Sequence, residues 1–252
     1  MTREKIFNHR FNERETLMQS MDRIKKELPP ELSSAKTCAM IGAGYGHLDL
    51  EFVGADGCLP DVNEIAAVDP DADLLAEFKR RVTKLFPAVR TSFYTETAQN
   101  WKGGDKPFDV VLMVELLYFI SPTQRPPLFK KLFDKVVASG GFVLLYIYPD
   151  PLWKPTTCFG RLVNRLNCPS LEDTDVGQIR DMMISAGFTY CCQVPMECQM
   201  NVKEPADDFF SLWELWSEGM LSKEEVREVA CEEFGETKVG SYPMILSVFK
   251  KP

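Results

Sequence analysis

Three glycines at alternate positions, Gly42, Gly44 and Gly46, directly follow an apolar run at 37–41. Glycines in a turn after a strand let the backbone come close to a ligand and offer it N–H groups, so the pattern indicates a nucleotide-type ligand. A dinucleotide fingerprint would place its third glycine where this sequence has His47. The spacing therefore does not favour a pyrophosphate. His47 itself is either a general base or, more simply, a helix-start residue.

Asp69 ends a second apolar run, 65–68. A carboxylate at the carboxyl end of a parallel strand can accept hydrogen bonds from both ribose hydroxyls of an adenosine. A nicotinamide oxidoreductase would also use such a residue, but the sequence has no Ser/Tyr/Lys hydride-transfer motif. Asp69 thus predicts an adenosine site without choosing the cofactor.

A carboxylate and several aromatic side chains follow the apolar run 108–114. Glu115 comes first, and it is interpreted either as a group that binds a cationic amine and accepts its proton or as a helix-start glutamate bound by backbone N–H groups. Aromatic faces attract cations, although aromatic residues more often form plain core. The candidates for an aromatic box are Tyr118, Phe119, Tyr148, Trp153 and Phe159.

No metal site is expected. Asp69 to Asp73 begins like a calcium loop, but Leu74 replaces the glycine and Arg80 the glutamate that such a loop requires. The 8 cysteines form no C-x-x-C pair, and only 2 histidines are present. The cysteines are therefore interpreted as reduced thiols.

The segments that must position these residues alternate between strand and helix patterns. Strands are expected at 37–41, 65–68, 89–94, 108–114, 142–147, 188–194 and 244–249. Helices are expected at 11–28, from 47 to 53, at 71–86, 123–138, 175–186, 205–217 and 222–234. This alternation predicts an α/β fold with a doubly wound, seven-stranded, mostly parallel sheet, an N-terminal helical cover and a C-terminal helical insertion.

Four parts of the chain are expected. They are the helical cover (1–35), a Rossmann-like cofactor-binding domain (36–200), a helical insertion on the substrate side (201–240) and the final strand (241–252). A proline-rich and aromatic loop at 149–172 interrupts the domain, and loops of this length are usually functional or disordered.

Composition limits the possible partners. With 252 residues and a net charge of -8, the chain lacks the basic balance of a nucleic-acid-binding surface. It has no apolar run long enough for a membrane span and no secretory leader. We expect a cytoplasmic, monomeric protein that acts on a small molecule.

Taken together, four motifs resemble those of class I S-adenosylmethionine-dependent methyltransferases. They are I-G-A-G-Y-G-H-L-D-L at 41–50, V-D-P at 68–70, T-E-T at 95–97 and D-V-V-L-M-V-E at 109–115. The resemblance implies S-adenosylmethionine as cofactor. The residues expected to bind it are Gly42, Gly44, Gly46, Asp69, Glu96, Thr97, Ala98 and Val114.

Within that class, M-V-E-L-L-Y-F at 113–119 is similar to the corresponding segment of histamine N-methyltransferases. The similarity implies a small amine as methyl acceptor. The residues expected on the acceptor side are Glu15, Glu115, Tyr118, Phe119, Tyr148, Trp153 and Tyr242, with Glu115 as the catalytic carboxylate.

The sequence departs from those enzymes at three substrate positions, which argues against histamine itself. Arg14 lies where the family has a glutamate, although Glu13 and Glu15 flank it. Tyr242 or Ser241 replaces an asparagine, and Glu115 replaces a glutamine. Methylation of a thiol, hydroxyl or carboxylate, or a cofactor-binding interaction protein without activity, remain the alternatives.

Overall fold

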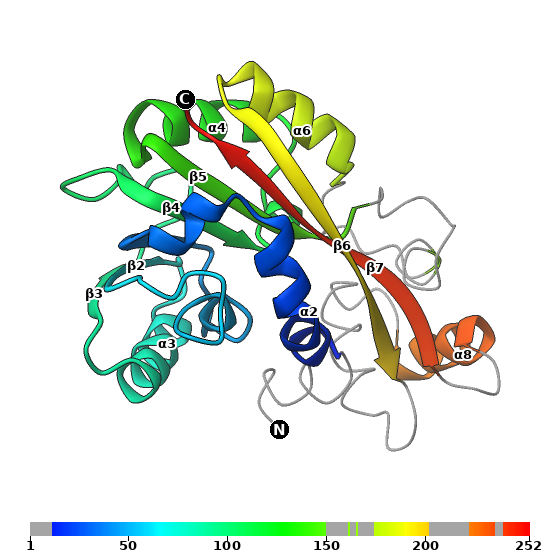
Figure 1. Ribbon diagram of the computed structural model, residues 1–252. Helices are drawn as coiled ribbons and strands as arrows, with labels where there is room; N and C mark the ends of the chain where they lie inside the picture. The colour runs from blue at the N-terminus through cyan, green and yellow to red at the C-terminus, as the bar shows by residue number, and fades with distance from the viewer. Residues whose placement is uncertain (1–11, 150–160, 162–164, 166–173, 202–221, 235–238) are drawn as a thin grey trace.

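A computed structural model describes residues 12–149, 161, 165, 174–201, 222–234 and 239–252. Its centre is a seven-stranded sheet in the order β3-β2-β1-β4-β5-β7-β6 (Figure 1). The strands are β1 (Thr37–Ile41), β2 (Glu64–Val68), β3 (Arg90–Tyr94), β4 (Phe108–Val114), β5 (Val137–Ile147), β6 (Thr189–Asn201) and β7 (Val239–Lys250). Neighbouring strands from β3 to β5 are parallel, whereas β7 runs antiparallel to both β5 and β6.

Helices cover both faces of the sheet because apolar side chains from the strands point to each side (Figure 1). The helices are α2 (Glu13–Glu27), α3 (Ala72–Leu85), α4 (Arg125–Lys131), α6 (Val176–Ser185) and α8 (Lys223–Phe234). Side chains of α2 and α3, such as Leu17 and Phe78, belong to one core cluster. Those of α4 and α6, such as Phe129 and Ile179, belong to the other. Each fully buried side chain of this size contributes about 1.5 to 3 kcal/mol.

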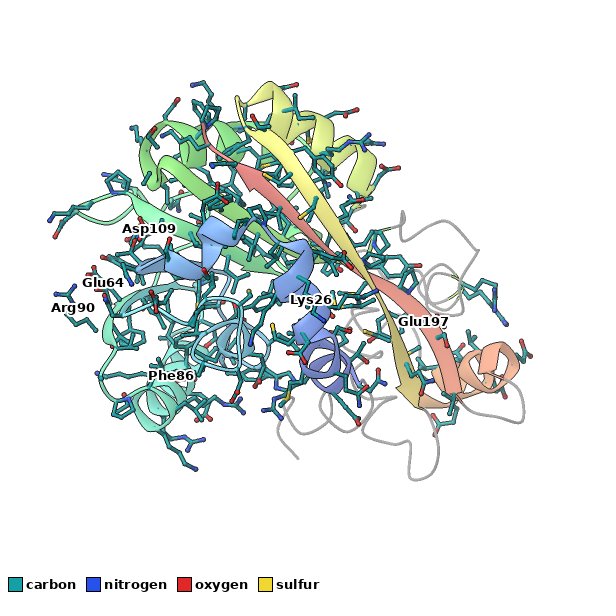
Figure 2. All side chains as sticks on the ribbon, viewed as in Figure 1. Lys26, Glu64, Phe86, Arg90, Asp109 and Glu197 are labelled. Carbon is teal, nitrogen blue, oxygen red and sulfur yellow. The ribbon has the colours of Figure 1, made fainter. Side chains whose placement is uncertain are left out.

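The amino-terminal ends of the parallel strands are fixed by polar contacts (Figure 2). Asp109 Oδ2 at the start of β4 accepts hydrogen bonds from Lys36 N (2.8 Å) and Thr37 N (3.0 Å), which align β1 with β4. Arg90 and Glu64 form an exposed ion pair at 2.7 Å between the starts of β3 and β2. In doubly wound sheets, ligands usually bind at the opposite edge, where the parallel strands end.

The predicted fold class is confirmed, and one predicted helix is wrong. The segment after the glycine loop forms only a 3-10 turn, η2 (Asp49–Phe52), instead of a helix from 47 to 53. The chain turns immediately afterwards at Gly54, whose φ is 87°, and at Gly57, where a Cβ would lie 2.3 Å from Phe52 O. The apolar pattern at 48–53 therefore comes from a compact turn that is packed into the core.

Other boundaries shift without changing the architecture. Helix α4 continues into a π-helical turn, η4 (Leu132–Val136), and β6 and β7 extend further than their apolar cores suggested. The four-part division of the chain stays a prediction, and the helix expected at 205–217 lies outside the described residues. Within the described residues, no helix is long and apolar enough to cross a bilayer.

Candidate active site at the carboxyl edge of the sheet

The glycine loop folds back onto the neighbouring strand. Val68 O, at the end of β2, accepts hydrogen bonds from Gly42 N (2.8 Å) and Ala43 N (3.1 Å). Gly42, Gly44 and Gly46 have φ values of 71°, 49° and 72°, a conformation that favours glycine. The alternating glycines are therefore required by the backbone of the loop, whatever it binds.

Asp69 holds this loop from the end of β2. Its Oδ2 accepts a hydrogen bond from Gly44 N at 2.9 Å, and its Oδ1 accepts one from Asp71 N at 2.9 Å. The side chain is buried but borders the pocket, and each carboxylate oxygen can accept a second bond. Asp71 in turn caps α3 by accepting bonds from Asp73 N and Leu74 N. Asp69 thus combines a structural role with free acceptor capacity.

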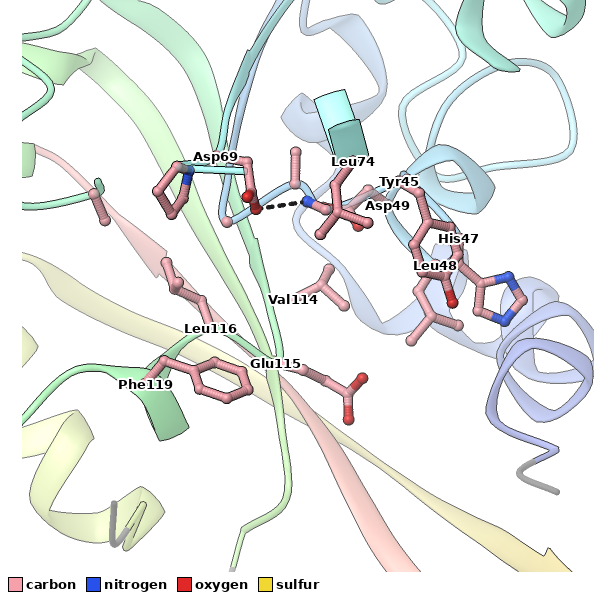
Figure 3. Close-up of a pocket in the computed structure, with 16 residues that line it drawn as sticks. Tyr45, His47, Leu48, Asp49, Asp69, Leu74, Val114, Glu115, Leu116 and Phe119 are labelled. Atoms are coloured by element: carbon pink, nitrogen blue, oxygen red, sulfur yellow. Dashed lines mark hydrogen bonds between the residues drawn. The ribbon is translucent and has the colours of Figure 1, made fainter. Parts of the chain in front are cut away.

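A cavity of about 400 Å³ opens between the glycine loop, the end of β2 and the end of β4 (Figure 3). Its lining consists of residues 42–49, Asp69, Pro70, Leu74, Ala98, 114–116 and Phe119. Phe119, at the rim, is 61% exposed. Most of this lining is apolar, with carboxylates at a few fixed places, which is the usual character of a small-molecule site.

The glycines show where a ligand has room. A Cβ on Gly42 would lie 2.5 Å from the Leu116 side chain, and one on Gly46 would lie 2.6 Å from Phe78. A Cβ on Gly44 would meet no heavy atom of the described residues within 4 Å, its two chain neighbours aside. Glycine is thus needed at positions 42 and 46 because neighbouring side chains pack against the backbone there. At position 44 it leaves open space beside the pocket.

Glu115, at the end of β4, has an unusual backbone. Its φ is 50°, the only positive value among the described residues other than glycine. Such a conformation costs about 1 to 3 kcal/mol and is found preferentially at functional sites. The bond from Glu115 N to Tyr146 O (2.9 Å) holds the residue to β5, and the side chain points into the cavity (Figure 3).

A second buried carboxylate comes from α2. Glu13 is 3% exposed, and its Oε1 accepts a hydrogen bond from Tyr242 Oη of β7 at 2.5 Å. Its Oε2 has no partner among the described residues. Burial raises the pKa of Glu13 to about 7, and the bond from Tyr242 opposes that rise.

Asp49 and Glu115 line the cavity, and together with the buried Glu13, whose charge acts on Glu115, they are called the acidic cluster here. Burial raises the pKa of each, and the charges of Glu13 and Asp49 raise the pKa of Glu115 further. His47 does not neutralise them, because burial and the nearby Arg14 lower its pKa to about 4. The acidic cluster therefore favours a ligand with positive charge.

The residues expected from the sequence are distributed unevenly. The cavity lining includes Gly42, Gly44, Gly46, Asp69, Ala98, Val114, Glu115 and Phe119. Of the remaining cofactor candidates, Thr97 is half-buried and Glu96 is exposed, and neither lines the cavity.

On the acceptor side, Tyr118 and Tyr148 are buried outside the cavity lining, and Tyr148 N donates to Tyr118 Oη at 2.5 Å. Glu15 is exposed and binds Gln19, so the buried carboxylate of α2 is Glu13. Tyr242 donates a hydrogen bond to Glu13 and is not among the described residues that line the cavity, and Trp153 lies outside the described residues.

Several lining residues were not expected from the sequence. They are Tyr45, Leu48, Asp49, Leu74 and Leu116. The signal for Asp49 was available, because an acidic residue inside the apolar run 48–53 must be buried or must interrupt it. The apolar lining residues carry no such signal, since nothing in a sequence separates a leucine beside a cavity from one in the core.

Comparison with known proteins points to the methyltransferases. Residues 39–141 match the family described as a methyltransferase domain. No curated protein matches this sequence.

Among solved structures, the chain is similar to a proposed methyltransferase of Bacillus halodurans C-125, with 16% identity, a TM-score of 0.66 and coverage of 93% of this chain and 98% of that one. It is also similar to the N-methyltransferase NodS of Bradyrhizobium japonicum WM9 in complex with S-adenosylhomocysteine, with 13% identity, a TM-score of 0.54 and coverage of 92% and 86%. A third similar structure is the cyclopropane synthase MmaA2 of Mycobacterium tuberculosis, with 13% identity, a TM-score of 0.59 and coverage of 93% and 84%.

The chain therefore has the Rossmann-like fold of class I methyltransferases, with a methyltransferase domain at 39–141. Several structures of this fold contain S-adenosylmethionine or S-adenosylhomocysteine, which supports S-adenosylmethionine as the cofactor class. Because the similar proteins include both N-methyltransferases and a cyclopropane synthase, the fold leaves the methyl acceptor open.

The buried Glu13 predicts a pH-dependent stability. A carboxyl group whose pKa rises from 4.5 to about 7 on folding binds more protons in the folded state, so stability is lost as pH rises between these values. We expect Glu13→Gln to flatten the decrease in the free energy of unfolding between pH 4.5 and 7, by about 3 kcal/mol at most. Urea unfolding at several pH values measures it. Glu15→Gln, on the exposed side of the same helix, is the control, and equal pH profiles for both variants would contradict the assignment.

Proposed function

We propose that this protein is an S-adenosylmethionine-dependent methyltransferase whose acceptor is a small, cationic amine. The observation that carries the proposal is the open space at Gly44, between the ribose-type acceptor Asp69 and the acidic cluster, at the carboxyl edge of a class I methyltransferase fold. A ligand there would have a polar adenosine end beside Asp69 and a positively charged end beside the carboxylates.

The residues present fit this cofactor. Asp69 would accept bonds from the ribose hydroxyls, the backbone of the glycine loop would border the methionine end, and Ala98 with Val114 would line the adenosine side. When bound, the cofactor supplies an activated methyl group on a sulfonium. The protein then has to align the acceptor with that group and exclude water, which requires neither a strong nucleophile nor a metal.

The acidic cluster supports an amine acceptor. An amine reaches the pocket as a cation, which carboxylates favour, but it must lose a proton before its nitrogen can attack. Glu115 is directed into the cavity and has a raised pKa, so it is suited to bind the ammonium form and accept the proton. Phe119 at the rim would add an aromatic face for the cation.

The finer assignments expected from the sequence belong to this proposal. A histamine N-methyltransferase-like activity fits the buried glutamate on α2, which accepts a hydrogen bond from Tyr242. An acceptor other than histamine is favoured because Tyr242 or Ser241 replaces an asparagine of that family. We further propose a monomeric, cytoplasmic protein, which size-exclusion chromatography and cell fractionation would test.

Two measurements test the class and the acceptor separately. Calorimetric titration should show binding of S-adenosylmethionine and no binding of NAD(P). A methyl-transfer screen with labelled cofactor should then give product with amines. If product forms only with thiols, hydroxyls or carboxylates, the amine proposal is wrong while the methyltransferase stands. If the cofactor binds and no acceptor reacts, the protein is a binding protein without this activity.

Glu115 provides the sharpest test of the amine. We expect Glu115→Gln to lower kcat/KM for the amine by about 100-fold or more, the usual size of general acid–base effects, and to leave cofactor affinity within about threefold. The loss should vary with pH because the variant has no titrating group at this position. The control is Glu64→Gln, since Glu64 forms an exposed ion pair with Arg90 at the opposite edge of the sheet. Unchanged turnover in Glu115→Gln would remove Glu115 from the reaction.

A further inference from the structure

Asp49 is a buried member of the acidic cluster to which the proposed function assigns no contact of its own. It lies in the 3-10 turn η2 just after the glycine loop, it is 4% exposed, and it lines the cavity. Its Oδ1 has no hydrogen-bond partner in the part of the chain that the structure describes. A buried charged oxygen without a partner is costly, which indicates that a ligand supplies one.

The groups around Asp49 indicate the charge of that ligand. Burial raises the pKa of Asp49, and the charge of Asp69 raises it further. The charge of Asp49 in turn raises the pKa of Glu115. Asp49 thus lies within electrostatic reach of two other acids, and His47, two residues away, has a pKa lowered to about 4 and stays neutral near pH 7. A cation beside Asp49 would offset the cost of ionising this carboxyl group in its buried place.

The position of Asp49 along the cavity indicates which of the two expected cations, the cofactor or the acceptor amine, it would contact. If the adenosine end of the cofactor binds beside Asp69, as proposed, the methionine end would border the glycine loop and the residues that follow it, which line the cavity up to Asp49. Glu115 approaches the cavity from the other side, at the end of β4 (Figure 3). In that orientation, the positively charged nitrogen of the cofactor would lie on the Asp49 side.

We propose that Asp49 binds the α-ammonium group of the cofactor's methionine end and so selects ligands that carry this group. The inference rests on the proposed function, because it assumes that S-adenosylmethionine occupies this cavity. It assigns separate carboxylates to the two cations of the reaction, with Asp49 for the cofactor and Glu115 for the acceptor amine.

The test compares ligands that differ only in the ammonium group. S-adenosylhomocysteine and its deamino analogue, in which hydrogen replaces the α-amino group, are titrated by calorimetry into wild type and Asp49→Asn. We expect the variant to bind S-adenosylhomocysteine about ten- to a hundredfold more weakly, as for a lost charge-assisted bond, and to bind the deamino analogue within about threefold of wild type. Equal losses for both ligands would overturn the proposal.

A charge control separates this contact from the general acidity of the pocket. Asp71→Asn also removes a negative charge near Asp69, but Asp71 caps α3 outside the cavity lining, and asparagine is an equally good cap. We expect this variant to bind both ligands within about threefold of wild type. A selective loss of S-adenosylhomocysteine in Asp71→Asn as large as in Asp49→Asn would overturn the assignment.

Wild type alone keeps the proposal testable if Asp49→Asn does not fold. It must bind S-adenosylhomocysteine at least about tenfold more tightly than the deamino analogue, and equal affinities would refute the contact. A variant that raises KM for the amine but keeps both ligand affinities would place Asp49 on the acceptor side instead. If wild type binds neither S-adenosylhomocysteine nor S-adenosylmethionine, the proposed function itself fails, which is a different result from any of these.

Discussion

Gly44→Val is expected to abolish cofactor binding while the protein remains folded. The new side chain would extend into the space beside Gly44, where a Cβ would meet no atom of the described residues within 4 Å apart from its chain neighbours, and would block the region proposed for the methionine end. A branched residue is also strained at a φ of 49°. We expect the affinity for S-adenosylhomocysteine to fall by at least about a thousandfold, or about 4 kcal/mol, as measured by calorimetry.

A second glycine gives a matched control for this variant. Gly140 lies near the start of β5 and also has a positive φ, of 77°. A Cβ there would likewise meet no heavy atom of the described residues within 4 Å, its chain neighbours aside. Gly140→Val therefore imposes a comparable backbone strain far from the cavity, and it should lower stability without changing cofactor affinity. If Gly44→Val still binds tightly, the loop is a structural turn, and the cofactor site must be sought elsewhere.

Asp69→Ala is expected to weaken cofactor binding by at least about 100-fold. Bonds from ribose hydroxyls to a buried charged acceptor are worth about 1.5 to 3 kcal/mol each, and the substitution also removes the acceptor that holds Gly44 N at 2.9 Å. Circular dichroism and thermal melting should show that the fold persists, since the sheet does not depend on this contact. Calorimetry with S-adenosylhomocysteine measures the affinity.

Two further variants separate the causes of this loss. Asp69→Asn keeps an oxygen acceptor but loses the charge, so its affinity should fall between those of wild type and Asp69→Ala. Asp73→Ala removes a carboxylate from the exposed first turn of α3 and should bind normally. Unchanged affinity in a folded Asp69→Ala protein would show that Asp69 only shapes the loop.

The centre of the sheet was predictable from the sequence because β1, β2 and β4 are buried and therefore appear as continuous apolar runs. The run at 108–114 is the clearest case, and it forms β4 over the same residues. The loop glycines and Asp69 were predictable for the same reason, since they follow directly from the ends of two such strands.

The local sequence pattern gave wrong or incomplete predictions where tertiary contacts determine the structure. The segment from 47 to 53 has helical spacing, but Gly54 and Gly57 turn the chain before a helix can form. Glu13 and Glu15 are the same residue type, two positions apart, so the sequence does not tell which of them is buried. The orientation of α2 decides this, because it directs Glu13 to Tyr242 of β7 and leaves Glu15 in solvent. The positive φ of Glu115 has no sequence signal either, because it depends on how β4 leaves the sheet.

Helix α2 also packs against β6, and this contact affects whether the protein can associate with itself. Strand β6 is an outer strand of the sheet, and the free backbone groups of such strands are templates for pairing with a second chain. Asn12 occupies two of these groups, since its N donates to Gln199 O at 3.1 Å and its Oδ1 accepts from Gln199 N at 2.6 Å. Arg23 donates to Pro195 O, and Pro195 itself has no N–H to offer. The helix that brings Glu13 to the acidic cluster thereby also protects this strand from intermolecular β-pairing, so damage to α2 would expose an aggregation-prone edge as well as alter the active site.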